Sequence, residues 1–251
     1  MKLPISLVII SLNEERNIER CIRSVPFASE VIVLDSGSTD KTLQIAKELG
    51  AHIHHQAWQG FGIQKAKATE LAKNDWVLNL DADEALSPEL ASEIIQKALS
   101  LDPEVGYEFP RKSYHLGRWI MHGGWYPDAQ LRLFNKKFSK WQEAPIHEKV
   151  ISAKKERFKN PMLHWVFRNL SHQMQTNDRY STLQAEQHVK SGKKFSFFKM
   201  MIKPYIKFYE CYFFKLGFLD GFAGFVIAVG AGYSVFLRWV KIWELTKKKG
   251  A

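Results

Sequence analysis

The sequence predicts an α/β fold with a mostly parallel sheet, helices on both faces of that sheet, and an amphipathic helical extension at the C-terminal end. Three observations support this prediction. Strand-like apolar runs alternate with helix-like patterns over the first hundred residues, three of these runs end in polar or acidic side chains, and positive charge is concentrated in the last quarter. The 251 residues, 45% of them hydrophobic, are enough to bury one sizeable core.

The first strand and helix are predicted from residues 5–25. The apolar run Ile5–Ile10 contains mainly β-branched residues and leucine, as a buried strand does. Ile18, Cys21, Ile22 and Val25 then follow at helical spacing, so a helix with one buried face is expected after the strand.

The second unit repeats this order. Val31–Leu34 predicts a buried strand, and the Gly, Ser and Thr residues that follow predict a turn. A helix is expected from about Thr39, with Gly50 as its C-cap.

The third unit begins with the apolar run Trp76–Leu80. Ser87 is the expected N-cap of the next helix and Pro88 its first residue, because proline is well tolerated at that position. Apolar residues continue at helical spacing through Leu99. Alternation of this kind is typical of a parallel sheet covered by helices.

Polar segments follow three of the predicted strands, at 11–14, 35–38 and 81–84. Ligands of open α/β sheets bind beyond the carboxyl ends of the strands, so these segments are expected to share one cleft. Asp81, Asp83 and Glu84 would repel one another, which calls for a nearby positive group or a shared proton. Asp-x-Asp at a strand end suits Mg²⁺ or Mn²⁺, while the alternative is an Asx-rich turn before the helix.

Two further patterns limit the class of protein. No Gly-rich phosphate loop follows the first strand, which disfavours a Rossmann dehydrogenase or a P-loop NTPase. Cys21 and Cys211 are too few and too distant to predict a disulfide framework, and no signal peptide precedes the first apolar run. A reducing, cytoplasmic setting is therefore expected.

Charge divides the chain into a nearly neutral body, residues 1–189, and a basic, aromatic-rich end, residues 190–251. The net charge is +10, of which the end carries +9 through twelve Lys or Arg residues and three acids. Lys199, Lys203 and Lys207 recur every four residues, with Lys215 two such steps further on, and Pro204 is expected to kink or divide their helix.

The segment Gly221–Leu237 is an uncharged run of seventeen residues, at the short limit for a membrane span. Together with the lysines and aromatic residues before it, it predicts helices that lie on an anionic membrane surface rather than cross it. The alternative is that these helices cover a domain or a dimer contact. A nucleic-acid partner is not expected, because the charge is confined to a hydrophobic end.

The segments SLVIISLNEERNIERCIRSV, EVIVLDSGSTDKT and WVLNLDADE, in this order, resemble the nucleotide-sugar-binding half of inverting family 2 glycosyltransferases with the GT-A fold. The resemblance covers about residues 3–150 and extends more loosely to the C-terminal end. The strings PDAQLRLFNKK, APIHEKV, GFLDGFAGF and FLRWVKIWE are similar to bacterial lipopolysaccharide-core glucosyltransferases of the WaaE/KdtX type.

This resemblance implies roles for five residues of the strand ends. Asn13 and Glu14 correspond to first-strand contacts with the nucleotide, and Asp35 to the acid that binds the uracil edge. Asp81 and Asp83 correspond to the Asp-x-Asp that holds the ribose and the metal, with Asp83 the more direct metal ligand. The family's second acidic position after Asp35 is a serine here, so a ribose contact is expected to differ.

Three more residues are candidates with less specificity. Glu148, in IHEK, occupies the position of the catalytic base, although the family commonly has an acidic pair there. Asp128 is the alternative base, and a salt-paired surface acid is the alternative interpretation of either residue. Apart from the resemblance, His164 follows the apolar pair Met162–Leu163 and is a candidate for diphosphate or metal contact, while a lone histidine is more often structural.

The implied function is a metal-dependent inverting transfer of a hexose, glucose from UDP-glucose, to the inner core of a lipid A-linked oligosaccharide. This would take place at the cytoplasmic face of the bacterial inner membrane, with the enzyme peripheral or monotopic. One alternative is a glycosyltransferase for capsule or another lipid-linked glycan. An alternative of another class is a non-catalytic basic module that binds nucleic acid or a protein partner, and a nucleotidyltransferase would need a Gly/Lys/Arg-rich first loop that this sequence lacks.

Overall fold

The computed structural model describes residues 2–142 and 149–248, which form two compact units. The first, here the sheet unit, comprises Met1–Arg111 and Asp128–His164, and the second, the helical unit, comprises Lys112–Pro127 and Trp165–Ala251. This division differs from the expected boundary between residues 189 and 190. The helix that ends at Lys190 packs along the C-terminal helix, so it belongs with the segment that follows it.

The sheet unit is built on four parallel strands in the order β3-β2-β1-β4. They are β1 (Leu3–Ser11), β2 (Ala28–Asp35), β3 (His52–His55) and β4 (Trp76–Asp81). Beyond β4 the order continues β8-β6-β12-β5, with β8 antiparallel to β4 and β6, and with β11 and β7 paired to β6. These further strands are β5 (Glu84–Leu86), β6 (Val105–His115), β7 (Arg118–Ile120), β8 (Asp128–Asn135), β11 (Lys154–Arg157) and β12 (Met162–His164), of which β7 and the last four residues of β6 belong to the helical unit.

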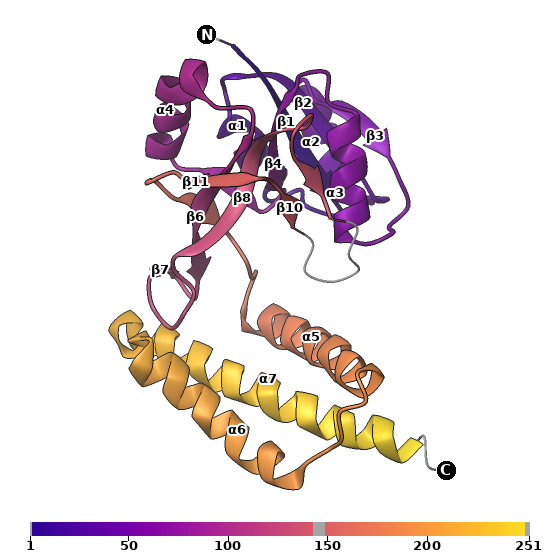
Figure 1. Ribbon diagram of the computed structural model, residues 1–251, viewed down its shortest axis with the longest axis vertical. Coiled ribbons are helices and arrows are strands. Elements are labelled where there is room, and N and C mark those ends of the chain that lie inside the picture. The colour runs from indigo at the N-terminus through magenta and orange to yellow at the C-terminus, as the bar shows by residue number, and fades with distance from the viewer. Residues whose placement is uncertain (1, 143–148, 249–251) are drawn as a thin grey trace. The chain divides into compact units, whose positions relative to one another are not determined.

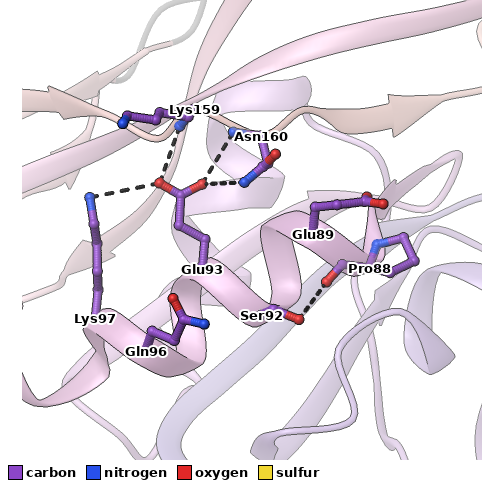
Figure 2. A pocket seen from close by; sticks show the side chains of 8 residues that line it. All are labelled: Pro88, Glu89, Ser92, Glu93, Gln96, Lys97, Lys159 and Asn160. Carbon is purple, nitrogen blue, oxygen red and sulfur yellow. Dashed lines mark hydrogen bonds and ion pairs between the residues drawn. The ribbon is translucent and has the colours of Figure 1, made fainter.

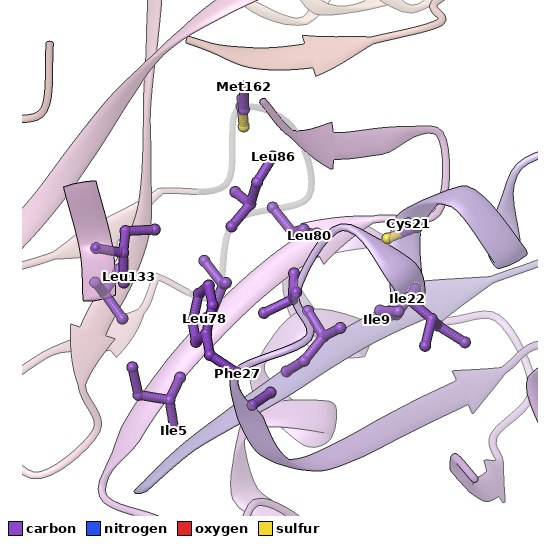
Figure 3. Close-up of a cluster of buried hydrophobic side chains, with 14 of the residues drawn as sticks. Ile5, Ile9, Cys21, Ile22, Phe27, Leu78, Leu80, Leu86, Leu133 and Met162 are labelled. Carbon is purple, nitrogen blue, oxygen red and sulfur yellow. The ribbon is translucent and has the colours of Figure 1, made fainter. Parts of the chain in front are cut away.

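Both faces of β1 are buried. Successive side chains of a strand point to opposite faces, and here the two sets of side chains belong to two different apolar clusters. Leu7 and Ile9 belong to one apolar cluster, with Cys21 and Ile22 of α1 (Ile18–Arg23), part of which Figure 3 shows. The intervening Val8 and Ile10 belong to a second cluster, with Ala68 of α3 (Phe61–Glu70). Helices therefore cover both faces of the sheet, as the alternating pattern predicts.

The predicted helix boundaries are confirmed where a specific cap sets them. The Ser87 hydroxyl accepts a hydrogen bond from the Leu90 amide at 3.1 Å, and Pro88 opens α4 (Pro88–Lys97). Gly50 has a φ of +80° just after α2 (Thr42–Glu48), a conformation that favours glycine. The latter helix begins three residues later than expected, because the Asp40 side chain holds the preceding residues in a turn through the Thr42 amide.

The helical unit contains three long helices: α5 (Leu170–Lys190), α6 (Phe197–Tyr209) and α7 (Gly221–Lys248). Helix α7 packs against both α5 and α6 and lies between them (Figure 1). Pro204 lies inside α6 and does not divide it. Gly232 of α7 faces the Pro204 carbonyl so closely that a Cβ atom there would be 2.8 Å from its oxygen, so the glycine permits the two helices to approach.

The segment Gly217–Lys247 is long and apolar enough to cross a membrane, judged by length and composition alone. Within it, 39% of the most apolar stretch of 18 residues is buried inside the protein. The connection before α7 consists of a π-helical turn, Glu210–Phe214, and a 3₁₀ turn, Gly217–Asp220. The remaining short elements are a 3₁₀ turn, Ala98–Ser100, and the two-stranded sheet of β9 (Lys140–Trp141) and β10 (Val150–Ile151).

Candidate active site

The three polar strand ends lie side by side at one edge of the sheet. Ser11 of β1 pairs with Asp35 of β2, and Ile10 of β1 pairs with Asp81 of β4. Because these three strands are adjacent and parallel, their carboxyl ends coincide, as the sequence predicts. The segments that follow them provide the side chains described next.

Asp35 organises the turn after β2. One of its carboxylate oxygens, Oδ2, accepts hydrogen bonds from the Gly37 and Ser38 amides, both at 2.8 Å. The other, Oδ1, accepts from the hydroxyls of Ser11 at 2.9 Å and Ser38 at 2.5 Å. Burial favours the neutral acid, but these hydrogen bonds outweigh burial and hold the pKa of Asp35 below its usual value.

Asn13 and Glu14 fasten the first polar segment to this turn. Asn13 has a φ of +57°, and its side-chain oxygen accepts a hydrogen bond from the Thr39 amide at 2.8 Å. The backbone amide of Asn13 donates a hydrogen bond to the Ser38 hydroxyl at 2.9 Å, and the backbone amide of Glu14 donates to the Thr42 hydroxyl at 2.7 Å. The two loops thus form one hydrogen-bonded platform beyond β1 and β2.

Buried cations balance the acids after β4. Asp81 Oδ1 lies 2.9 Å from Lys65 Nζ, and Asp81 Oδ2 lies 2.7 Å from Arg132 Nη2. Lys65 comes from α3 and Arg132 from β8, and both side chains are almost fully buried. Burial alone would raise the pKa of Asp81, but the charges of Arg132 and Lys65 hold it well below the usual range.

Glu84 completes this network. Its Oε1 accepts from Arg132 Nη2 at 2.6 Å and from Arg111 Nη1 at 3.1 Å, and its Oε2 accepts from the Asp81 amide at 3.0 Å. Arg111 also binds the carboxylate of Asp128 through its Nε atom at 2.9 Å. The positive groups that the clustered carboxylates require are therefore two arginines and a lysine from three other elements.

Asp83 stands apart from this network. Its side chain is 28% exposed, and its Oδ2 lies 3.4 Å from Nε2 of His164, the last residue of β12. Strand β12 pairs with β5 so that His164 lies opposite Glu84, which explains why a residue so distant in sequence reaches the Asp-x-Asp turn. The structure therefore brings together two of the three predicted metal contacts, Asp83 and His164, whereas the third, Asp81, is paired with Lys65 and Arg132.

A divalent cation fits this arrangement if substrate supplies most of its ligands. Mg²⁺ commonly uses one or two carboxylates together with water and substrate phosphates. Asp83 is accessible for that role, whereas both oxygens of Asp81 already contact Lys65 and Arg132. Asp83 is therefore the best candidate ligand. Among residues 2–142 and 149–248, no three His, Cys, Asp or Glu side chains are grouped as a metal site.

The two candidate bases differ in what the structure says of them. Glu148 lies outside the described residues, so its role stays a prediction from the sequence. Asp128 begins β8, where its carboxylate binds Arg111 and accepts a hydrogen bond from the Gln130 amide group at 2.8 Å. These contacts match the salt-paired alternative that the sequence left open.

A thiol lies directly behind the acidic turn. Cys21 of α1 is fully buried, and its Sγ contacts the Asp81 carbonyl oxygen at 3.6 Å. Burial, and then the carboxylates of Glu84, Asp83 and Asp81, raise the pKa of this thiol well above its usual value. Cys21 is therefore a packing residue of the site.

A shallow depression of about 660 Å³ lies elsewhere, on α4 (Figure 2). Its central side chain, Glu93, accepts hydrogen bonds from the Lys159 and Asn160 amides at 3.3 and 3.2 Å. None of its lining residues belongs to the acidic network, and Glu93 is used to hold the 159–160 turn. The lining consists of Pro88, Glu89, Ser92, Glu93, Gln96, Lys97, Lys159 and Asn160.

Replacing Arg132 by methionine should lower the free energy of unfolding by about 3 kcal/mol, because it leaves Asp81 and Glu84 in a buried site with one cation fewer. Urea unfolding followed by circular dichroism measures this. The control is Arg157→Met, which removes an exposed pair with Glu108 and should cost less than about 1 kcal/mol. Equal stability of the two variants would contradict the structural role of Arg132.

Replacing Asp35 by asparagine should destabilise the protein by about 1–3 kcal/mol at pH 7, because an amide NH₂ would face the donors that now bind the carboxylate. The folded-state pKa of Asp35 is lowered, so its stabilising effect is complete above the ordinary Asp pKa of about 4 and is lost as the pH falls through the folded value. The difference in the free energy of unfolding between wild type and variant should therefore become smaller below about pH 4. Urea midpoints at pH 7, 5 and 3.5 test this, and a constant difference would contradict it.

The fold and the acidic strand ends define the class: a nucleotide-sugar transferase fold of the GT-A type. The family model of glycosyl transferase family 2 matches residues 6–158. An uncharacterized glycosyltransferase of Rickettsia typhi is 35% identical over 97% of this chain and 88% of its own length. The lipopolysaccharide core biosynthesis glycosyltransferase LpsC of Rhizobium meliloti is 30% identical over 97% of this chain and 93% of its own length.

The chain therefore belongs to glycosyl transferase family 2 and is an enzyme of that family. This confirms the predicted family and fold class, and it does not support the alternative of a non-catalytic binding module. Among solved structures, glucosyl-3-phosphoglycerate synthase of Mycobacterium tuberculosis, in complex with Mn²⁺, UDP and glucosyl-3-phosphoglycerate, is 28% identical over 45% of this chain and 44% of that chain, with a TM-score of 0.36.

Proposed function

We propose that this enzyme is a metal-dependent, inverting hexosyltransferase that uses UDP-glucose and extends the inner core of a lipid A-linked oligosaccharide. One observation carries the donor half of the proposal: Asp83 remains accessible beside His164, while its neighbours Asp81 and Glu84 are neutralised by buried cations. An accessible carboxylate at the carboxyl end of a parallel sheet suits the metal of a nucleoside diphosphate.

The acceptor half rests on a relative. LpsC is a lipopolysaccharide core biosynthesis glycosyltransferase, and its similarity extends over nearly the whole of both chains. A lipid-linked acceptor also suits the apolar helices of the helical unit. We propose that the reaction takes place at the cytoplasmic face of the inner membrane. Transfer to a capsule precursor or another lipid-linked glycan would use the same donor site.

Each residue then has a defined task. The platform of Asn13, Glu14 and Asp35 positions the nucleotide. Asp35 is buried and its two oxygens already accept four hydrogen bonds, so it acts through the turn that it holds rather than by the direct contact with the uracil edge that the resemblance implies. Asp81, which Lys65 and Arg132 hold in place, would contact the ribose. Asp83 and His164, which contact each other, would face the diphosphate.

For inversion, a carboxylate must remove the proton of the acceptor hydroxyl as its oxygen attacks the anomeric carbon from the face opposite the diphosphate. We assign this task to Glu148. A divalent cation, when bound, would stabilise the negative charge of the departing diphosphate.

The first test is calorimetric titration of the full-length protein with UDP-, GDP- and CDP-sugars, with and without Mn²⁺. We expect UDP-glucose to bind selectively and only with the metal. Selective binding of a GDP- or CDP-sugar would overturn the donor assignment, and metal-independent binding would remove the role of Asp83. Acceptor assays with lipid A-linked core oligosaccharides then separate the proposed acceptor from capsule precursors.

A further inference from the structure

Helix α6 has apolar side chains on two opposite faces. One face packs on α7: Met200 joins the cluster around Trp239, and Phe208 lies 6.0 Å from Phe225 between ring centroids. The opposite face, here the outer face, is exposed and repeats at helical spacing. It is formed by Phe197, Phe198, Met201, Ile202, Tyr205 and Ile206.

The connection between α6 and α7 also exposes large apolar side chains. These residues, together with Phe222 in the first turn of α7, are here called the tip: Phe213, Phe214, Leu216, Phe218, Leu219 and Phe222. Phe214 is 83% exposed and Phe222 is 79% exposed. A soluble monomer rarely exposes a contiguous apolar surface of this extent, so the outer face and the tip need an occupant.

The charged side chains near the tip form ion pairs within the helical unit. Lys207 and Lys215 both form ion pairs with Glu210, at 3.1 and 2.5 Å. Asp220 is buried, accepts hydrogen bonds from the Met121 and His122 amides, and lies 3.4 Å from Arg118 Nη2. The predicted stripe of four lysines is therefore reduced, because two of its members are already paired.

The lysines that remain lie toward the other end of α6. Lys199 and Lys203 are exposed and lie beside the outer face. Lys203 Nζ also lies 5.8 Å from the ring centroid of Trp239, on the α7 side of the helix. A row of aromatic and aliphatic side chains flanked by lysines complements a lipid surface, whose acyl chains accept the former and whose anionic headgroups attract the latter. A second protein copy would not need these lysines.

We propose that α6 lies along an anionic bilayer, with the outer face and the tip buried in one leaflet, and that apolar burial rather than lysine charge provides most of the binding. The choice of a bilayer as occupant rests on the proposed function, in which the acceptor is lipid-linked. Tyr205 and Tyr209, exposed on α6, suit the interface because they join an apolar ring to a polar hydroxyl.

The test is flotation of the full-length protein with vesicles of phosphatidylcholine alone or with one quarter phosphatidylglycerol. The variants Phe198→Glu and Phe214→Glu alter opposite ends of the surface at exposed positions, so both should fold. Each should lower the partition coefficient at least tenfold, because a charge replaces a buried ring. The control Leu99→Glu changes a fully exposed leucine of the sheet unit and should bind as wild type does.

A double variant, Lys199→Gln with Lys203→Gln, should lose only the additional affinity for anionic vesicles. Loss of all binding in that variant would overturn the apolar contribution, and an effect of Phe214→Glu without one of Phe198→Glu would overturn the orientation along the surface. The other possible occupant of the outer face is a second copy of the chain, which sedimentation velocity without detergent tests. If the protein is a dimer that Phe198→Glu dissociates while vesicle binding is unchanged, a second copy covers the outer face and the proposal is wrong.

Titration of the same variants with UDP-glucose and Mn²⁺ separates this inference from the proposed function. Donor binding should be unchanged in all of them. If wild type binds vesicles as expected but no nucleotide sugar, the proposed donor fails while the membrane surface stands.

Discussion

Replacing Asp83 by alanine should abolish Mn²⁺-dependent binding of UDP-glucose and reduce transfer at least 10³-fold, an estimate of about 4 kcal/mol in transition-state stabilisation. The physical reason is that Asp83 is the accessible carboxylate of the acidic turn, whereas both Asp81 oxygens already contact cations. The other two carboxylates of the acidic turn, Asp81 and Glu84, could take its place only by breaking a buried ion pair.

Folding should survive this substitution, because Asp83 is partly exposed and its contact with His164, at 3.4 Å, is a weak ion pair. Calorimetry measures donor binding, and thermal unfolding checks integrity. The control is Glu89→Ala, which removes an exposed acid of the first turn of α4 and should leave donor binding intact. Wild-type binding by Asp83→Ala would remove the metal assignment.

Replacing Glu148 by glutamine should leave UDP-glucose binding unchanged and reduce the transfer rate by about 10²–10⁴-fold, the usual contribution of a general base. Glutamine keeps the size of the side chain but cannot accept the proton of the acceptor hydroxyl. Single-turnover transfer measures the chemical step, and calorimetry measures donor binding.

Asp128→Asn is the matched comparison for that experiment. Asp128 is committed to Arg111 and Gln130, so its amide variant should keep most of the transfer activity. If Asp128→Asn loses transfer while Glu148→Gln retains it, the base is Asp128.

The sheet and its ligand edge could be predicted because their sequence signals are local. Ile5–Ile10 and Trp76–Leu80 are apolar runs that became β1 and β4, and the Ser87 cap and Gly50 turn act within a few residues. Adjacent parallel strands then bring their carboxyl ends together, so the convergence of Ser11, Asp35 and Asp81 follows from topology.

Helix α3 lacked such a signal. Its inward-facing residues include Gln64, Lys65 and Thr69 rather than an apolar stripe, so helical periodicity could not reveal it. Lys65 can be buried there because it forms an ion pair with Asp81, sixteen residues later in the chain. This pair forms only when α3 packs against the end of β4. Sequence pattern alone does not contain that information.

The two arginines of the acidic network were missed for the same reason. Arg132 lies within the apolar string LRLF. A charged residue in a buried strand indicates that its side chain has an oppositely charged partner inside the protein. Its partners Asp81 and Glu84 are about fifty residues earlier in the chain. His164 was identified as a candidate, but only the pairing of β12 with β5 shows why it reaches Asp83.

The buried thiol of Cys21 offers a built-in reporter of donor-site integrity. Alkylation requires both exposure and a thiolate, and this side chain has neither while α1 stays packed behind the Asp81 carbonyl. Its rate of modification by a maleimide would therefore measure how often the acidic turn and α1 separate. Ligands that hold the turn closed would slow the labelling, so chemical footprinting at one sulfur atom can rank candidate donors before any acceptor is known.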